Sequence, residues 1–120
     1  MNLLAVDPGI DVTGVAVFRV AGLRTNASWS DLPARLVVSG SIKTPGTMAS
    51  MYMASGGLIC AAKLQCCKVL MVPAPKMKKK ERAAIVRTMW PTLGRTNEDQ
   101  RDAIYLGAAT ILDNRRRWTA

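Results

Sequence analysis

Residues 3–18 decide the fold, and they read Leu3-Leu4-Ala5-Val6-Asp7-Pro8-Gly9 and then, after a short bend, Thr13-Gly14-Val15-Ala16-Val17-Phe18. Two apolar, β-prone segments on either side of a Pro-Gly turn are typical of a β-hairpin. Asp7 is the exception within this pattern, because a carboxylate in an apolar strand costs free energy unless it is paired or binds a cation. Two interpretations of Asp7 are therefore open: it caps the turn before Pro8, or it belongs to a metal site.

The composition indicates one basic domain. The chain has 120 residues, enough for one hydrophobic core and too few for two domains of ordinary size. Its 17 Lys and Arg residues outnumber 8 Asp and Glu residues, and the net charge of +9 is typical of a protein that binds a polyanion, most often nucleic acid. We expect a single domain over residues 1–120, with residues 115–120 as a basic tail.

The apolar segments and the cysteines predict a cytoplasmic protein. No run is long enough to span a membrane, and the N-terminus lacks the pattern of a secretory signal. The three cysteines Cys60, Cys66 and Cys67 include a vicinal pair, and the chain has no histidine. They are interpreted as reduced thiols of the core, because three clustered cysteines alone make a poor zinc site.

Strands and helices alternate along the rest of the chain, which predicts the α/β class with a mixed sheet. A right-handed crossover after the first helix would place the next short strand parallel to the hairpin, beside its first strand. The expected elements are a polar loop over 21–33, a third antiparallel strand over 36–42, a helix over 47–65, the parallel strand over 68–72, a basic helix ending near Trp90 and a last helix over 98–114.

The helix over 47–65 is apolar nearly all round, which predicts burial on more than one side. Its Gly56-Gly57 pair lowers helix propensity but permits another element to approach closely. Two interpretations remain: a core helix, or a helix that also forms the seam of a homodimer. The expected seam residues are Met51, Tyr52, Ser55, Gly56 and Ile59.

The last helix begins with Asp99 and Asp102, which are three residues apart and therefore share one helix face. Acids in a first turn also simply suit the helix dipole. If this pair docks beside Asp7, however, the three carboxylates form an oxygen cluster suited to Mg²⁺ or Mn²⁺. Two such ions can activate a water and stabilise the leaving oxygen in phosphodiester hydrolysis, so this cluster on a basic protein points to a nuclease.

These motifs resemble the RuvC family of Holliday junction resolvases, which has a ribonuclease H-like fold. The resemblance is carried by Val6-Asp7-Pro8-Gly9 with Thr13-Gly14, by Asp99-x-x-Asp102-Ala103, and by the segment from Gly56-Gly57 through Pro73 to Met77-Lys78. It implies a homodimeric, Mg²⁺-dependent endonuclease that cuts branched DNA, and the compact length suits a phage or mobile-element version. Asp7, Asp99 and Asp102 would be the catalytic metal ligands.

The sequence departs from the family at its fourth acid, a Glu near the end of a central parallel strand. No acid lies between Asp31 and Glu81, and the expected parallel strand ends in Val72-Pro73. Asp11 and Glu98 are the candidates to reach a metal through water. Because loss of a bridging carboxylate weakens a two-metal site, the alternative hypothesis is an impaired or inactive dimer that binds branched or duplex DNA without cutting it.

The basic side chains are the expected DNA contacts, although a solvated basic face would show the same composition. They gather after the expected parallel strand, around the acidic cluster and in the tail. The expected DNA-binding residues are Lys76, Lys78, Lys79, Lys80, Arg82, Arg87, Arg95, Arg101, Arg115, Arg116 and Arg117.

Overall fold

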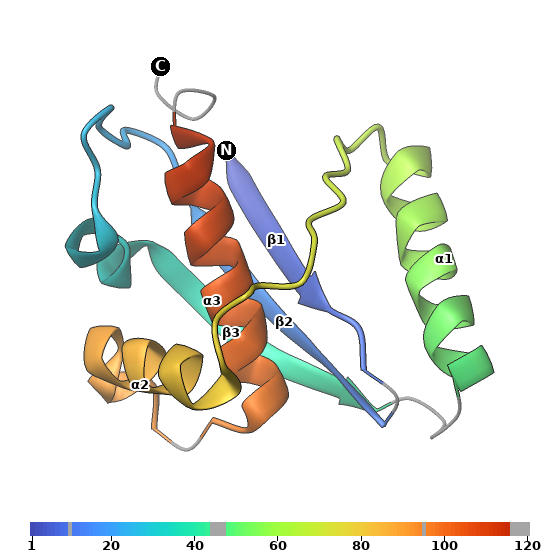
Figure 1. Cartoon of the computed structure of the whole chain (residues 1–120). Coiled ribbons are helices and arrows are strands. Elements are labelled where there is room, and N and C mark those ends of the chain that lie inside the picture. The colour runs from blue at the N-terminus through green and yellow to red at the C-terminus, as the bar shows by residue number, and fades with distance from the viewer. Residues whose placement is uncertain (10, 44–47, 95, 116–120) are drawn as a thin grey trace.

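The three N-terminal strands form one antiparallel sheet in the order β1 (Asn2–Asp7), β2 (Val12–Arg19), β3 (Leu36–Lys43) (Figure 1). The computed structural model describes residues 1–9, 11–43, 48–94 and 96–115, and the side chains of 48–52 and 54 lie outside this description. In the hairpin register, Ala5 lies opposite Ala16 and Asp7 lies opposite Gly14. The predicted hairpin and antiparallel meander are therefore confirmed.

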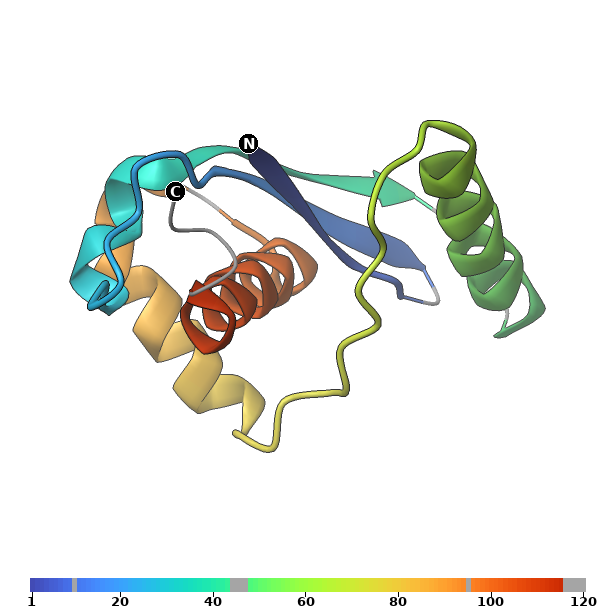
Figure 2. The same cartoon turned by 90° about the horizontal axis from the view of Figure 1, so that it is seen from above.

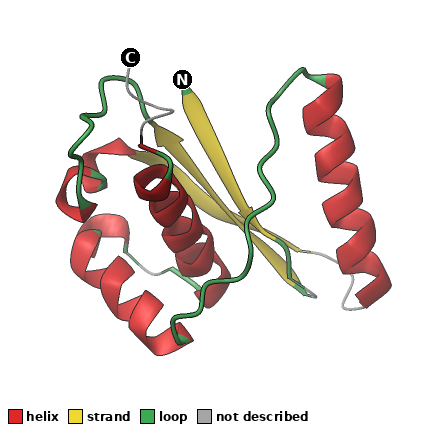
Figure 3. Ribbon diagram, turned by 45° about the horizontal axis from the view of Figure 1, so that its top comes forward, coloured by secondary structure: helices red, strands yellow, loops and turns green. Residues whose placement is uncertain are grey.

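Two helices cover one face of this sheet (Figures 2 and 3). α3 (Glu98–Asp113) runs across the sheet and packs mainly on β1 and β2, and α2 (Lys79–Met89) packs against α3. Short 3-10 turns at Trp29–Asp31 and Pro33–Arg35 lie between β2 and β3, and a third at Pro91–Leu93 lies between α2 and α3. The chain is thus an α/β structure in which the C-terminal helices sit on the N-terminal sheet.

The core lies between α3 and the sheet. Phe18, Ile104 and Ile111 are completely buried there. Trp90 meets the ring of Phe18 edge-on at 6.3 Å between ring centroids, and its Nε1 donates a hydrogen bond to the Pro33 carbonyl at 3.2 Å. The indole N–H of the buried Trp90 is therefore hydrogen-bonded, and this bond links the end of α2 to the segment before β3.

The contact between α3 and the sheet depends on Gly107. A Cβ at this position would overlap the ring of Phe18 and would lie 2.9 Å from the Ala5 Cβ. Without a side chain here, the backbone of α3 approaches the hairpin closely enough for Phe18 to be fully enclosed.

A Gly107→Ala variant is expected to be less stable by about 2 kcal/mol, because the overlap with Phe18 and Ala5 outweighs the higher helix propensity of alanine. Chemical denaturation measures this difference. Gly57→Ala is the matched control, because a Cβ at Gly57 meets nothing within 4 Å, and it should raise stability by about 0.5 to 1 kcal/mol through propensity alone. Equal effects of the two substitutions would contradict the close approach.

The predicted parallel strand over 68–72 is wrong. This segment has no ladder hydrogen bonds, and the sheet of the described residues is purely antiparallel. Met71 is 78% exposed, and the segment runs past β1 as an extended connection (Figure 1). The physical reason lies in Pro73 and Pro75, since prolines cannot donate to a ladder and end the run after five residues.

The prediction that α1 (Met48–Leu64) is buried on more than one side is wrong for the side chains that the structure describes. Met53 is 77% and Leu64 is 82% exposed, and the helix stands beside the sheet, away from α2 and α3 (Figure 2). The three cysteines, expected in the core, are exposed as well. An apolar sequence favours burial, but it does not determine which surface will cover the helix.

Candidate metal and DNA-binding site

Asp7 lies at the carboxyl end of β1, directly opposite Gly14 of β2. A Cβ on Gly14 would overlap the backbone carbonyl of Asp99, so the first turn of α3 rests on the bare backbone of β2. A Cβ on Gly9 would lie 3.5 Å from Asp99 Oδ1, which places the turn after β1 beside the same carboxylate. The glycines of the hairpin therefore allow an acidic helix end to sit next to Asp7.

A capping box fixes where α3 begins. The Asn97 side chain accepts a hydrogen bond from the Gln100 backbone N–H at 2.8 Å, and the Gln100 side chain accepts one from the Asn97 N–H at 3.0 Å. This reciprocal arrangement satisfies two helix-terminal donors and sets the rotation of the first turn. Asp99 and Asp102 consequently line the same groove as Asp7.

That groove has a volume of about 580 Å³ and lies where β1, the first turn of α3 and the start of α2 meet. Its polar lining has both signs of charge, and the extended segment 72–75 supplies an apolar wall without any acid. The charged residues that line it are Asp7, Asp11, Asp99, Asp102, Lys79 and Arg82.

The groove disfavours a third negative charge. The pKa of Asp7 is raised from 3.8 to about 6, first because the carboxyl is partly buried and then because Asp102 and Asp99 repel its ionised form. Arg82 and Lys79 lower this pKa but do not offset the rise. A bound cation would offset both the burial of this charge and its repulsion by the neighbouring carboxylates. The groove therefore favours cation binding.

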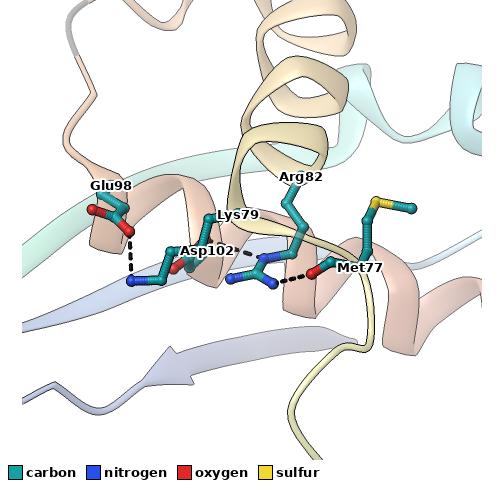
Figure 4. A network of polar contacts seen from close by, with 5 residues as sticks. All are labelled: Met77, Lys79, Arg82, Glu98 and Asp102. Carbon is teal, nitrogen blue, oxygen red and sulfur yellow. Dashed lines mark hydrogen bonds and ion pairs between the residues drawn. The ribbon is translucent and has the colours of Figure 1, made fainter.

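Arg82 is held inside the groove and is not part of the exposed basic run (Figure 4). The side chain of Arg82 is only 11% exposed, and that of Asp102 is 17% exposed. The Arg82 Nε lies 3.4 Å from the Asp102 Oδ1. Its Nη1 donates to the backbone carbonyl of Met77. The sequence placed Arg82 among the surface cations, and no local signal distinguishes it from its neighbours in the basic run.

Carboxylate oxygens and a negative potential match the chemistry of Mg²⁺ or Mn²⁺. Among the described residues, however, no group of three acidic or cysteine side chains is placed to hold a metal ion together. Asp102 is engaged by Arg82, which leaves Asp7 and Asp99 as the pair beside the Gly9 turn. Two carboxylates fit an ion that keeps several waters, which is how Mg²⁺ commonly binds.

The other acids expected near a metal lie further out. Asp11 is exposed at the rim of the groove. Glu98 forms an exposed ion pair with Lys79, with 2.7 Å between Nζ and Oε1, and this contact lowers the pKa of Glu98 (Figure 4). Glu98 is therefore engaged by Lys79 and does not line the groove.

The remaining basic residues differ in exposure. Lys76, Lys78, Lys80 and Arg87 are exposed around α2, whereas Arg101 is half-buried and donates to the Thr96 carbonyl. Of the basic residues at the C-terminus and in the bend before α3, the structure describes only Arg115. Arg115 is exposed and donates to the Leu112 carbonyl at 2.7 Å, while Arg95, Arg116 and Arg117 lie outside the described residues.

The expected dimer residues lie on α1. Ser55 and Ile59 are half-buried and Gly56 is exposed, and a Cβ at Gly56 would meet nothing within 4 Å. The side chains of Met51 and Tyr52 lie outside the described residues.

Comparison with known proteins identifies the fold. The sequence matches no protein-family profile and no curated protein. The structure is similar to the solved structure of RuvC from Thermus thermophilus, with a TM-score of 0.74 and 17% sequence identity. The match covers 98% of each chain. Within the described residues, no helix is both long and apolar enough to cross a membrane. The similarity shows that this chain has a RuvC-like fold.

Proposed function

We propose that this protein is a metal-dependent endonuclease that binds branched DNA, such as a four-way junction, and hydrolyses its phosphodiester backbone. The observation that carries the proposal is the groove that Asp7, Asp99 and Asp102 line on a RuvC-like fold. The net charge of +9 supports a polyanionic substrate.

Each part of the groove has a role in this proposal. Asp7 and Asp99 would hold Mg²⁺ or Mn²⁺, which supplies an activated water and charge neutralisation when bound. The exposed lysines just before and within the first turn of α2, Lys76, Lys78 and Lys80, would bind the phosphate backbone beside the groove. The apolar segment 72–75 would narrow the groove and limit water around the reacting phosphate.

A homodimer formed through α1 belongs to the same proposal. The helix exposes large apolar side chains, among them Leu58 at 38% and Leu64 at 82%, and it carries no acid. Burial of this surface against a second copy would remove apolar area from water and would set two grooves on one junction.

A second candidate function is junction binding without cleavage. Two observations favour it: segment 72–75 brings no acid to the groove, and Arg82 engages Asp102. Incubation with a synthetic four-way junction in Mg²⁺ or Mn²⁺, beside a linear duplex of the same sequence, separates the two functions. Cut junction with intact duplex supports the nuclease, and a gel shift without any product in either metal supports the binding module.

A variant with Lys76, Lys78 and Lys80 all changed to Ala is expected to bind junction DNA more weakly and with a smaller salt dependence. Each phosphate contact contributes roughly 0.9 to the slope of log affinity against log salt concentration, so three lost contacts lower it by about 3. Fluorescence anisotropy at several salt concentrations measures this slope.

The control changes three exposed basic residues away from the groove, Arg19, Arg24 and Lys63, to Ala, with the same loss of charge. An equal fall in slope for both triple variants would mean that net charge alone, and not the basic run beside the groove, holds the DNA.

A further inference from the structure

We propose that the guanidinium of Arg82 takes the place of a second metal ion, so that the groove binds a single divalent cation through Asp7 and Asp99 while Asp102 positions Arg82. The inference rests on the proposed metal-dependent cleavage and adds a specific assignment within that site. It makes Asp102 a positioning residue for an arginine, where the sequence predicted a metal ligand.

Arg82 is held in a fixed position in the groove. Its side chain is 11% exposed and is held on one side by Asp102 and on the other by the Met77 carbonyl (Figure 4). An arginine held at two points has lost most of its side-chain freedom before any ligand arrives. Its charge also acts on Asp7 across the groove, since it lowers the pKa of that carboxyl. Arg82 is therefore a permanent cation of the acidic groove.

The charge balance of the groove favours a single divalent cation. Asp7, Asp99, Asp102 and the Arg82 guanidinium leave the inner groove with a net charge of about two negative units, which one divalent cation neutralises, and Asp11 adds an exposed carboxylate at the rim. Lys79 and Glu98 neutralise each other at the rim. A second divalent ion would require further acid, and the segment 72–75 supplies none.

The placement of the carboxylates also favours a single ion. No three acidic side chains in the described ranges are placed to hold one ion, and Asp102 is engaged by Arg82. Asp99 Oδ1 lies against the Gly9 turn that follows Asp7. An ion on these two carboxylates would complete its shell with water and phosphate oxygens, which is a common arrangement for Mg²⁺.

A guanidinium can stabilise a phosphate group in place of a metal ion. Its planar fork can donate two hydrogen bonds to the oxygens of one phosphate group. A fixed donor aimed at oxygens that gain charge during phosphoryl transfer stabilises the transition state without reorganisation. Arg82 would supply this beside a single bound ion.

The test exchanges the ion pair for a neutral pair and measures Mn²⁺ binding by isothermal titration calorimetry. The unmodified protein should bind one Mn²⁺ per chain. The double variant Arg82→Met with Asp102→Asn should still bind one, with a dissociation constant within about threefold, because the net charge is unchanged and no ligand is lost. Asp99→Asn should weaken Mn²⁺ binding by roughly a hundredfold, since it removes a direct ligand.

Junction cleavage provides the second readout. The double variant should cut a four-way junction at least about a hundredfold more slowly than the unmodified protein despite its bound Mn²⁺, because the guanidinium is gone. Arg82→Lys should bind one Mn²⁺ as well but cleave slowly, since an ammonium lacks the planar fork. Asp113→Asn with Arg24→Met removes the same charges at exposed positions outside the groove and is the matched control.

Two Mn²⁺ ions bound to the unmodified protein, or loss of Mn²⁺ binding in the double variant, would overturn the inference, because Asp102 would then be a metal ligand. One Mn²⁺ bound to both proteins, but no cleavage of junction DNA by the unmodified protein, would instead overturn the nuclease function and leave the single-ion site standing. Absence of Mn²⁺ binding in every variant would overturn both. Far-UV circular dichroism verifies that each variant is folded.

Discussion

An Asp7→Asn variant is expected to cleave a four-way junction roughly a thousandfold more slowly, because it removes a metal ligand from the reacting centre. In the absence of metal it should nevertheless be more stable than the unmodified protein at pH 7.5. Both effects have one origin: burial and the neighbouring Asp102 and Asp99 disfavour the ionised carboxylate of Asp7, and a bound cation would offset this cost.

The sign of the stability effect follows from the pKa of Asp7. Folding raises this pKa from 3.8 to about 6, so the folded state binds more protons than the unfolded state between these values. Stability contributed by the protonated carboxyl is present below about pH 4 and is lost as the pH rises toward about 6. Asparagine does not ionise, and its gain at pH 7.5 should be about 1 to 2 kcal/mol once partial exposure is taken into account.

Thermal unfolding without metal at pH 4 and pH 7.5 measures this effect. The melting temperature of Asp7→Asn should exceed that of the unmodified protein by several degrees at pH 7.5 and by little at pH 4. Added Mg²⁺ should raise the melting temperature of the unmodified protein alone. Asp113→Asn, which changes an exposed acid at the end of α3, is the control. A stability difference that does not change with pH would contradict the raised pKa.

A Gly14→Ala variant is expected to lose about 3 kcal/mol of stability and most of its Mn²⁺ affinity together. The added Cβ overlaps the Asp99 carbonyl, which belongs to helix backbone and cannot rotate away as a side chain could. The first turn of α3 would have to move from β2, and Asp99 would move away from Asp7 with it. Chemical denaturation and Mn²⁺ titration of the folded fraction measure the two losses.

Gly40→Ala tests whether this loss is specific to the contact with α3. Gly40 lies on β3, opposite Val15, and its Cβ would meet only the Val15 side chain at 3.6 Å, an ordinary contact distance. This control should retain Mn²⁺ affinity and lose little stability. If Gly14→Ala behaved in the same way, α3 would not rest on the β2 backbone at the site.

The hairpin, the third strand and both C-terminal helices were predictable because each is encoded locally. Alternating apolar residues and a Pro-Gly turn define the hairpin, and the spacing of Ala103, Ile104 and Ile111 defines the buried side of α3. The acids at the start of that helix were visible as a pair on one face. Their position beside Asp7 in the groove depends on the tertiary structure, because the glycines of the hairpin let the first turn of α3 contact β2.

The errors share a physical cause. Residues 68–72 have strand propensity, but a strand exists only where a ladder forms, and prolines at 73 and 75 remove two donors. α1 is apolar, but apolarity does not specify a partner, and in the described structure the helix stands beside the sheet. The burial of Arg82 had no local signal, because its partner Asp102 is brought to it only by the packing of α2 on α3.

The sequence by itself determined the antiparallel hairpin, the helix with two acids on one face and the basic character of the chain, since these depend on neighbouring residues and on composition. Only the tertiary structure decided which charges share the groove. It set Asp7 against Asp99 and Asp102, raised the pKa of Asp7 and placed Arg82 on Asp102. Electrostatic interactions act through space and depend on burial, so the character of this site belongs to the fold and not to any one segment.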